Sequence, residues 1–137
     1  MATATTTWTE GMVFDSLVSG HHVTMDAEKE FGGNDMGPRP KFLLLAALSG
    51  CTGMDVVSIL KKMQVKTAGF TITARAEVAD DHPRVLTKIH LVYEFKGKDL
   101  PMEKLRRACD LSQERYCSVS AMLKKACPVT YEIRTAV

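Results

Sequence analysis

Alternation between apolar and polar side chains predicts β-strands in the first part of the chain. We expect strands at residues 3–9, 12–18 and 21–26, because each is rich in β-branched residues or alternates with a period of two. Glu10-Gly11 and Ser19-Gly20 separate these segments and are typical of turns. This pattern predicts a three-stranded meander, followed by a loop over residues 28–40.

The middle of the chain contains its longest apolar stretch, which predicts a buried helix. Residues 42–48 are all apolar, and Pro40 suits the first turn of a helix, where its missing N–H has no cost. Apolar residues then recur at helical spacing, so we expect a long central helix from Pro40 to about Met63, broken or kinked near Ser49-Gly50. One small sheet does not provide enough cover for such an apolar helix, and this indicates a homodimer.

The second half of the chain returns to strands before two shorter helices. Residues 70–78 and 85–95 alternate with a period of two around a turn at 80–83, which predicts a long antiparallel hairpin. Helices are expected at 102–115 and 118–126, and a last strand at 129–134. The order βββ-α-ββ-αα-β predicts an α+β fold in which antiparallel sheets pack on the central helix, within a single domain of residues 1–137.

Charge and composition exclude several functional classes. The chain of 137 residues has 18 basic and 16 acidic side chains, and no basic run exceeds two residues, so nothing favours nucleic acid as a partner. The first eight residues lack the basic start and apolar block of a signal peptide. The apolar run 42–48 alone is too short to span a bilayer. We therefore expect a cytoplasmic protein with no membrane partner.

The cysteine spacing argues against a metal centre. The four cysteines, at positions 51, 109, 117 and 127, form no C-x-x-C pair, and the four histidines lack the spacing of metal ligands on a helix. We therefore expect no metal and no cofactor. In the cytoplasm thiols stay reduced, and disulfides there tend to be transient and catalytic.

Cys51 and Cys117 are the candidates for thiol chemistry. Both lie close to expected helix starts and among small polar residues, and a helix N-terminus lowers the pKa of a thiol. A thiolate attacks the O–O bond of a hydroperoxide and becomes a sulfenic acid, which a second cysteine converts to a disulfide. The alternative is that these cysteines are buried core residues. We interpret Cys109 and Cys127 in that way.

Two segments resemble the cysteine motifs of the OsmC/Ohr family. Residues 37–53, with Gly-Pro-Arg-Pro followed by Leu-Leu-Leu-Ala-Ala-Leu-Ser-Gly-Cys-Thr-Gly, resemble the first motif, and residues 110–119 resemble the second. Residues 56–60 and 84–96 are similar to the YhfA-type OsmC-like branch in particular. The likeness extends from Trp8 to Ile133.

The resemblance implies a two-layer α+β fold and an intertwined homodimer with active sites at its interface. Characterised members are peroxidases that reduce organic hydroperoxides. By this resemblance Cys51 is the peroxidatic cysteine and Cys117 the resolving one. An external thiol, in some members a protein-bound lipoyl dithiol, supplies the electrons.

The sequence departs from the family at two positions. Peroxidase members carry a glutamate in an Asn-Pro-Glu-Glu-like segment before the buried helix, and here that segment is Pro40-Lys41-Phe42. Their arginine lies in the N-terminal strands, but residues 1–36 contain no arginine. The two residues that orient and activate the thiolate in those members are thus not at the matching positions.

Four charged residues are auxiliary candidates. Arg39 or Lys41 would supply positive charge near the thiolate, although the ordinary alternative is a solvated helix start. Asp55 lies one helical turn after Cys51, and its negative charge would oppose thiolate formation. Glu114 precedes the second cysteine by three residues, with a surface ion pair as the alternative.

We therefore weigh two main functional hypotheses. The first is a thiol-dependent peroxidase that reduces organic hydroperoxides in oxidative stress defence. The second is a non-enzymatic dimer that binds a small apolar ligand or senses oxidants. A third, a nucleic-acid-binding module, is disfavoured by the modest net charge of +2.

Overall fold

A computed structural model describes residues 1–137, which form two compact units. The first unit comprises residues 1–44 and the second residues 45–137. All four cysteines belong to the second unit. The thiol chemistry expected from the sequence therefore depends on that unit's packing.

The first unit contains the predicted three-stranded antiparallel meander. Its strands are β1 (Ala4–Glu10), β2 (Val13–Val18) and β3 (His21–Met25), in the order β1-β2-β3. After β3, the Asp26 carboxylate accepts hydrogen bonds of 2.7–3.0 Å from the backbone N–H groups of Ala27, Asn34 and Met36. This side chain organises the loop, which contains the 3-10 turn η1 (Lys29–Phe31).

A continuous helix, α1 (Pro40–Lys62), follows the loop. It begins at the predicted proline, but the break expected near Ser49-Gly50 is absent. The Ser49 hydroxyl instead donates a 2.9 Å hydrogen bond to the carbonyl of Leu45, four residues earlier. A serine that bonds back to its own helix in this way can be accommodated without ending the helix.

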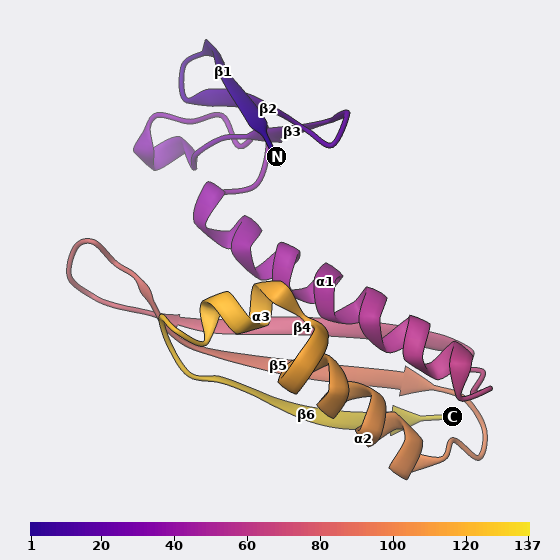
Figure 1. The fold of residues 1–137 in the computed structure, drawn as a ribbon. Helices are drawn as coiled ribbons and strands as arrows, with labels where there is room; N and C mark the ends of the chain where they lie inside the picture. The colour runs from indigo at the N-terminus through magenta and orange to yellow at the C-terminus, as the bar shows by residue number, and fades with distance from the viewer. The chain divides into compact units, whose positions relative to one another are not determined.

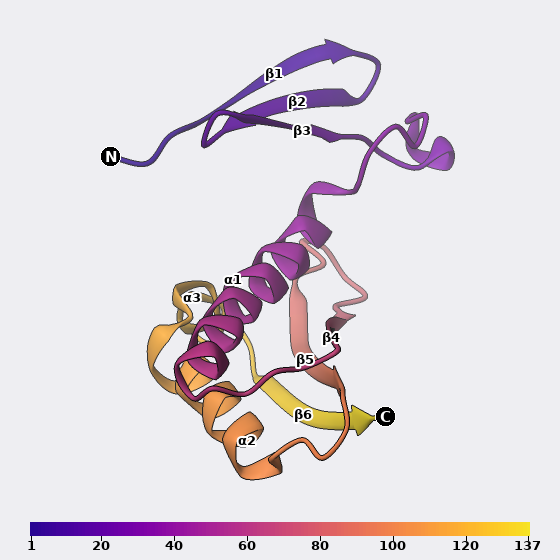
Figure 2. The same ribbon diagram turned by 90° about the vertical axis from the view of Figure 1, so that its right-hand side faces the viewer.

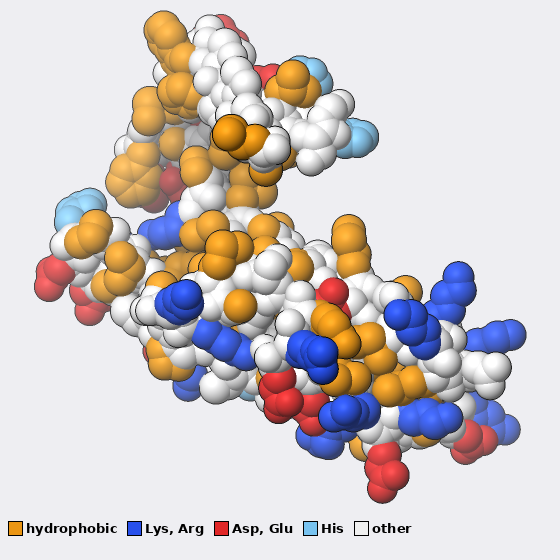
Figure 3. Space-filling view, viewed as in Figure 1, with side chains coloured by type: hydrophobic (Ala, Val, Ile, Leu, Met, Phe, Trp, Pro, Cys, Tyr) orange, Lys and Arg blue, Asp and Glu red, His pale blue; other side chains and the backbone are white.

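The expectation that the apolar part of α1 is fully buried is wrong for a single chain. Its buried positions are spaced by four and form one stripe, consisting of Leu48, Thr52, Val56 and Leu60. Other apolar side chains of the helix, Phe42, Leu44, Met54 and Val57, are 43–77% exposed. Hydrophobic side chains are visible on the surface along the course of α1 in Figure 3. One stripe faces the sheet, and the rest of the apolar surface is available to a partner.

By length and composition alone, α1 could cross a membrane. An 18-residue window has a mean hydropathy of 1.8, and 22% of that window is buried. The polar side chains in this window nevertheless have partners within the protein. Thr52 bonds to Tyr93 of the second sheet, and Asp55 accepts a bond from Ser112. The helix is therefore a packed element of this α+β fold.

The second sheet has the order β4-β5-β6. Its strands are β4 (Gly69–Val78), β5 (Leu86–Lys96) and β6 (Val129–Ala136). β4 and β5 form the predicted antiparallel hairpin, but β6 runs parallel to β5, from the Ile89–Val129 pair to the Lys96–Ala136 pair. The antiparallel pairing expected from the sequence holds for β4 and β5 but is wrong for β6. Helices lie between β5 and β6, and a helical crossover allows the next strand to run parallel.

Helices cover one face of this sheet (Figures 1 and 2). Beside α1 they are α2 (Met102–Leu111), a π-helical turn η2 (Ser112–Tyr116) and α3 (Ser118–Leu123). The predicted helix 102–115 thus changes to a wider turn at Ser112. The core lies between the two layers and includes Leu48, Val56, Leu91, Tyr93, Phe95, Leu105 and Ala108.

Cys109 and Cys127 are buried in this core, as their interpretation as core residues predicts. Burial raises the pKa of the Cys109 thiol to about 12. A thiol in that state is inert near neutral pH. The reactive candidates are therefore the other two cysteines.

Candidate functional site

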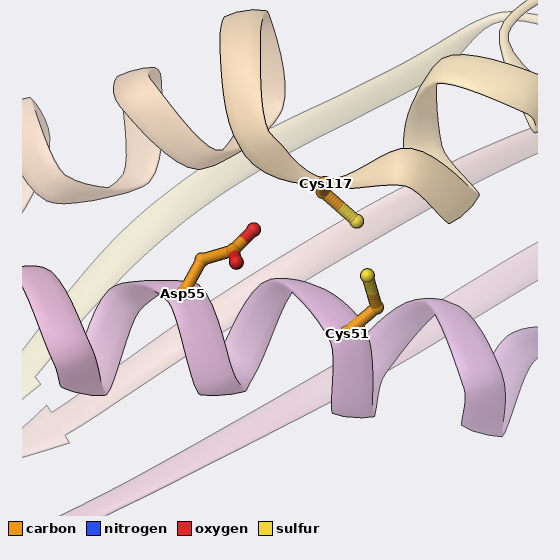
Figure 4. Close-up of side chains that lie close together, drawn as sticks. All are labelled: Cys51, Asp55 and Cys117. Carbon is orange, nitrogen blue, oxygen red and sulfur yellow. The ribbon is translucent and has the colours of Figure 1, made fainter.

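Cys51 and Cys117 lie next to each other although they are distant in sequence. Their sulfur atoms and a carboxylate oxygen of Asp55 all lie within 4.8 Å of one another, and both thiols are free. Figure 4 shows the three side chains converging, two from α1 and one from the segment between η2 and α3. A disulfide would require the two sulfurs to approach to about 2 Å. Only a local movement separates the thiols from that bond.

The position of Cys51 differs from the expectation. It lies in the middle of α1 rather than near a helix start. Cys51 and Asp55 are separated by four residues and therefore lie on the same face of the helix. The start of α1 cannot activate this thiol, because the influence of a helix terminus falls off within one turn.

The beginning of α3 stabilises the Cys51 thiolate instead. Burial by itself raises the pKa of Cys51, but hydrogen bonds from the Val119 N–H, the Cys117 thiol and the Ser118 hydroxyl outweigh that effect. The net result is a lowered pKa, even though the charge of Asp55 acts in the opposite direction. The Ser118 oxygen lies 3.9 Å from the Cys51 sulfur. Cys51 is half-buried and is therefore reachable from solvent.

Cys117 is in the opposite state. It is only 2% exposed, and its sulfur caps α3 by accepting a 3.3 Å hydrogen bond from the Ser120 N–H. Burial, with a smaller contribution from the neighbouring Cys51 and Asp55, raises the pKa of Cys117 to about 11, although the hydrogen bond from the Ser120 N–H acts in the opposite direction. At neutral pH Cys117 thus keeps its proton and can donate a hydrogen bond to the Cys51 thiolate. The two thiols are chemically different before any reaction begins.

A buried hydrogen-bond network lies behind the cysteines. The Thr52 hydroxyl lies 2.6 Å from the Tyr93 hydroxyl and 2.7 Å from that of Ser112. The Gln113 amide donates to the Tyr93 hydroxyl at 2.8 Å. No buried polar side-chain atom in the chain is without a partner. Fully satisfied networks of this kind hold their members in one arrangement.

This network reaches both sides of the cysteine pair. The Ser112 hydroxyl donates to the Asp55 carboxylate at 2.9 Å. The Ser120 hydroxyl donates to the Gln113 side-chain oxygen at 2.7 Å, while the Ser120 N–H bonds to Cys117. Ser112 and Gln113 are both buried at the start of the π-helical turn, which is a distortion often found at functional sites.

The sequence analysis did not identify these supporting residues. Five residues of the η2–α3 segment support the cysteines: Ser112, Gln113, Ser118, Val119 and Ser120. The only signal in the sequence was the group of small polar residues around Cys117. Their roles depend on the π-helical turn, which spacing alone does not reveal.

The other predicted charged residues have different positions. Arg39 forms ion pairs with Glu28 at 3.0 Å and Asp35 at 2.7 Å inside the first unit. Lys41 lies over the ring of Phe42 in the first turn of α1. Glu114 is exposed on η2 and is not part of the cluster of Cys51, Asp55 and Cys117. Asp55 lies with both cysteines.

Basic side chains lie on the surface near the end of α1 and along α2. A cavity of about 230 Å³ beside Asp55 is lined by Asp55, Ser58, Ile59, Lys62 and Tyr116. Exposed basic side chains near the end of α1 and on α2 include Lys61, Lys62, Lys104, Arg106 and Arg107. Figure 3 shows Lys and Arg side chains, with Asp and Glu among them, over the part of the surface formed by the end of α1 and by α2. Such a surface attracts acidic partners.

Comparison with known proteins identifies the class. The model of the family described as OsmC-like protein matches residues 32–132. The chain is 38% identical to Protein YhfA of Escherichia coli K12 over 132 residues, which is 94% of this chain and 96% of that protein. The chain belongs to the OsmC-like protein family, as its cysteine motifs suggest.

Solved structures share the fold. A hypothetical protein from Aquifex aeolicus VF5 aligns with a TM-score of 0.83 and 27% identity, covering 100% of this chain and 98% of that one. An organic hydroperoxide resistance protein from Elizabethkingia anophelis aligns with a TM-score of 0.74 and 18% identity, covering 99% and 96%. At 18% identity, the second alignment shows a shared fold.

Proposed function

We propose that this protein is a thiol-dependent peroxidase that reduces organic hydroperoxides through Cys51 and Cys117. The observation that carries the proposal is the opposite perturbation of two adjacent thiols, one with a lowered pKa and the other with a pKa of about 11. A nucleophile needs the thiolate form, whereas a resolving thiol can remain protonated until it reacts. The pair is arranged for these two roles.

In the first step the Cys51 thiolate attacks one oxygen of the hydroperoxide. The O–O bond breaks, the alcohol leaves after taking up a proton, and the sulfur becomes a sulfenic acid. The Val119 N–H, the Ser118 hydroxyl and the Cys117 thiol stabilise the attacking thiolate. In this proposal they supply the activation that the resemblance assigns to an arginine and a glutamate in other members.

In the second step the Cys117 sulfur attacks the sulfenic sulfur. A disulfide forms, and the hydroxyl leaves as water with the Cys117 proton. An external dithiol then reduces the disulfide by exchange and is itself oxidised to a disulfide. A lipoyl dithiol on an acidic carrier protein would suit the basic side chains at the end of α1 and on α2.

The working form in this proposal is a cytoplasmic homodimer. The exposed apolar side chains of α1 support it, since Met54 and Val57 are 77% and 56% exposed. A second copy of the chain would remove them from water, in line with the intertwined dimer that the family resemblance implies. Such burial contributes roughly 25 cal/mol for each Å² of apolar surface removed from water.

A groove on α1 supports the alternative of a ligand-binding protein. Val57, Lys61 and Phe70 are shared by two adjoining cavities of about 590 and 730 Å³, with mainly apolar walls. These volumes are in the range of pockets that hold small molecules. Cys51 does not line this groove, so a ligand bound there would not need the thiols.

Reaction of the reduced protein with hydroperoxides tests the proposal. Cumene hydroperoxide and hydrogen peroxide are mixed with the protein in turn, peroxide loss is followed, and disulfides are mapped by mass spectrometry. We expect rapid formation of a Cys51–Cys117 disulfide, faster with the organic peroxide and absent in Cys51→Ser. A reaction no faster than that of free cysteine would refute the peroxidase and favour the ligand-binding alternative.

A further inference from the structure

We propose that Cys51, Cys117 and Asp55 form a binding site for one thiophilic divalent cation of the Zn²⁺ class when both thiols are reduced. The three ligand atoms lie within 4.8 Å of one another, and the side chains converge from two separate segments (Figure 4). The cysteine spacing in sequence gives no indication of this site, because Cys51 lies in α1 and Cys117 in the segment between η2 and α3. This proposal departs from the expectation of no metal, which was drawn from the spacing of cysteines and histidines along the chain.

The distances suit tetrahedral coordination after a small closure. Zinc binds cysteine sulfur at about 2.3 Å and carboxylate oxygen at about 2.0–2.2 Å, so two ligands of one ion lie about 3.5–3.8 Å apart. Cys51 and Asp55 occupy successive turns of α1 and can reach the same ion from one side. Cys117 reaches it from the other side. Rotation about side-chain torsions that moves the ligand atoms by about 1 Å would complete the geometry.

The outer contacts also suit ligand residues. The Asp55 carboxylate is oriented by the Ser112 hydroxyl at 2.9 Å, and the Cys117 sulfur by the Ser120 N–H at 3.3 Å. Ligands of bound metals commonly have such second partners, which fix their direction. Three protein ligands leave a fourth position for water or for the Ser118 hydroxyl, which is 3.9 Å from the Cys51 sulfur.

The charges favour a cation. In the bound state two thiolates and one carboxylate would place three negative charges in a small volume, and a divalent cation offsets two of them. Binding joins Zn²⁺ to both sulfurs, with release of the Cys117 proton and of any proton on Cys51, and no electron is transferred. Histidine and further carboxylates are absent from the cluster, so the two sulfurs select a thiophilic ion over Mg²⁺ or Ca²⁺.

One consequence would link the cation to reactivity. A Zn²⁺-bound Cys51 is unavailable to a hydroperoxide, and a Cys51–Cys117 disulfide cannot hold the ion. This consequence rests on the proposed peroxidase function, whereas binding itself does not. The cation would then act as a reversible inhibitor of the reduced protein.

Titration of the full-length reduced protein with Zn²⁺ tests the site. Competition with a chromophoric chelator gives the affinity, and Co²⁺ substitution gives thiolate-to-metal charge-transfer absorption. We expect one ion per chain, with binding lost in Cys51→Ser. In Asp55→Asn, which removes a ligand, binding should weaken by at least about 10- to 100-fold, the loss that follows when a residue orienting a ligand is removed. The matched control Glu114→Gln removes a nearby carboxylate outside the cluster and should bind as the parent does.

Several results would overturn the site. These are no binding by the reduced parent, half an ion per chain, or affinity unchanged in Asp55→Asn with the fold intact by circular dichroism. The comparison of Asp55→Asn with Glu114→Gln keeps the test valid even if Cys51→Ser fails to fold. A protein that reduces peroxide but binds no Zn²⁺ refutes the cation site alone. One that binds Zn²⁺ through these residues but reduces no peroxide refutes the proposed function alone.

Discussion

Ser112 connects the buried network to the cysteine centre, because its hydroxyl donates to the Asp55 carboxylate at 2.9 Å. An ionised carboxylate only accepts, so the single Ser112 proton is used there. The Thr52 hydroxyl must then donate to Ser112, and the Tyr93 hydroxyl must donate to Thr52. The donor and acceptor in each of these hydrogen bonds follow from the carboxylate at the end of the series. Asp55 therefore connects the folded core with the reactivity of Cys51.

Replacing Asp55 by asparagine should make Cys51 more reactive. The Asp55 charge raises the pKa of the Cys51 thiol, so its removal lowers that pKa further and increases the thiolate fraction at neutral pH. We expect the rate of alkylation by iodoacetamide at pH 7 to rise severalfold. Glu114→Gln, which removes an exposed carboxylate, should leave the rate near that of the parent. A slower rate in Asp55→Asn would contradict this account of the site.

Labelling at different pH values should distinguish the two thiols. The pKa of Cys51 is lowered and that of Cys117 is raised to about 11, so between pH 7 and 9 Cys51 is increasingly ionised while Cys117 stays protonated. Alkylation followed by peptide mass spectrometry should show Cys51 reacting first, with a midpoint below that of an ordinary thiol. Cys117 should remain unlabelled until strongly alkaline pH. Equal labelling of both at pH 7 would disprove the assignment of roles.

Cys117→Ser should separate the two steps of the proposed reaction. Cys51 keeps the hydrogen bonds from the Val119 N–H and Ser118, so it still reacts with one equivalent of hydroperoxide. No partner thiol then closes the disulfide, and the sulfenic acid persists until dimedone traps it. Cys127→Ser, which changes a core cysteine outside the pair, serves as the control and should still form the disulfide. A Cys51 disulfide with another cysteine of the same chain would identify a different resolving residue.

Thr52→Val should destabilise the second unit. Thr52 is fully buried, and valine of similar shape removes the hydroxyl that bonds to both Tyr93 and Ser112. Loss of one partner from a buried network costs about 1–3 kcal/mol. Urea unfolding followed by circular dichroism measures this loss. Thr71→Val at an exposed position of β4 is the control, with an expected change within about 0.5 kcal/mol.

Val57→Asp should dissociate the proposed homodimer. Val57 is 56% exposed in the single chain and lies in the apolar groove of α1. A buried, unpaired carboxylate costs several kcal/mol, so the dissociation constant should weaken by about 100-fold or more. Sedimentation velocity measures the change. Met102→Asp alters another exposed apolar residue, the first of α2, which is 39% exposed, and should leave the dimer intact. A Val57→Asp protein that remains a full dimer would place the interface elsewhere.

The local patterns in the sequence were sufficient for most elements. Strands β1 to β5 were predicted from β-branched content or a period of two in segments bounded by turn residues. Helix α1 begins at Pro40 as predicted. The hydrophobic pattern did not reveal the direction of β6, because a strand has the same periodicity in a parallel and an antiparallel pair. It also overestimated the burial of α1, since composition cannot show which sides of a helix have a neighbour.

The sequence by itself determined the family, the fold class and the two candidate cysteines, because these depend on local motifs and periodicity. Only the tertiary structure decided that the pKa of Cys51 is lowered and that of Cys117 is raised. Cys51 lies in mid-helix, and its thiolate is stabilised by Ser118 and Val119, which are remote in sequence. Asp55 meets Cys117 only because η2 packs against α1. Hydrogen bonds and charge act over a few ångströms in space, and only the folded chain sets those distances.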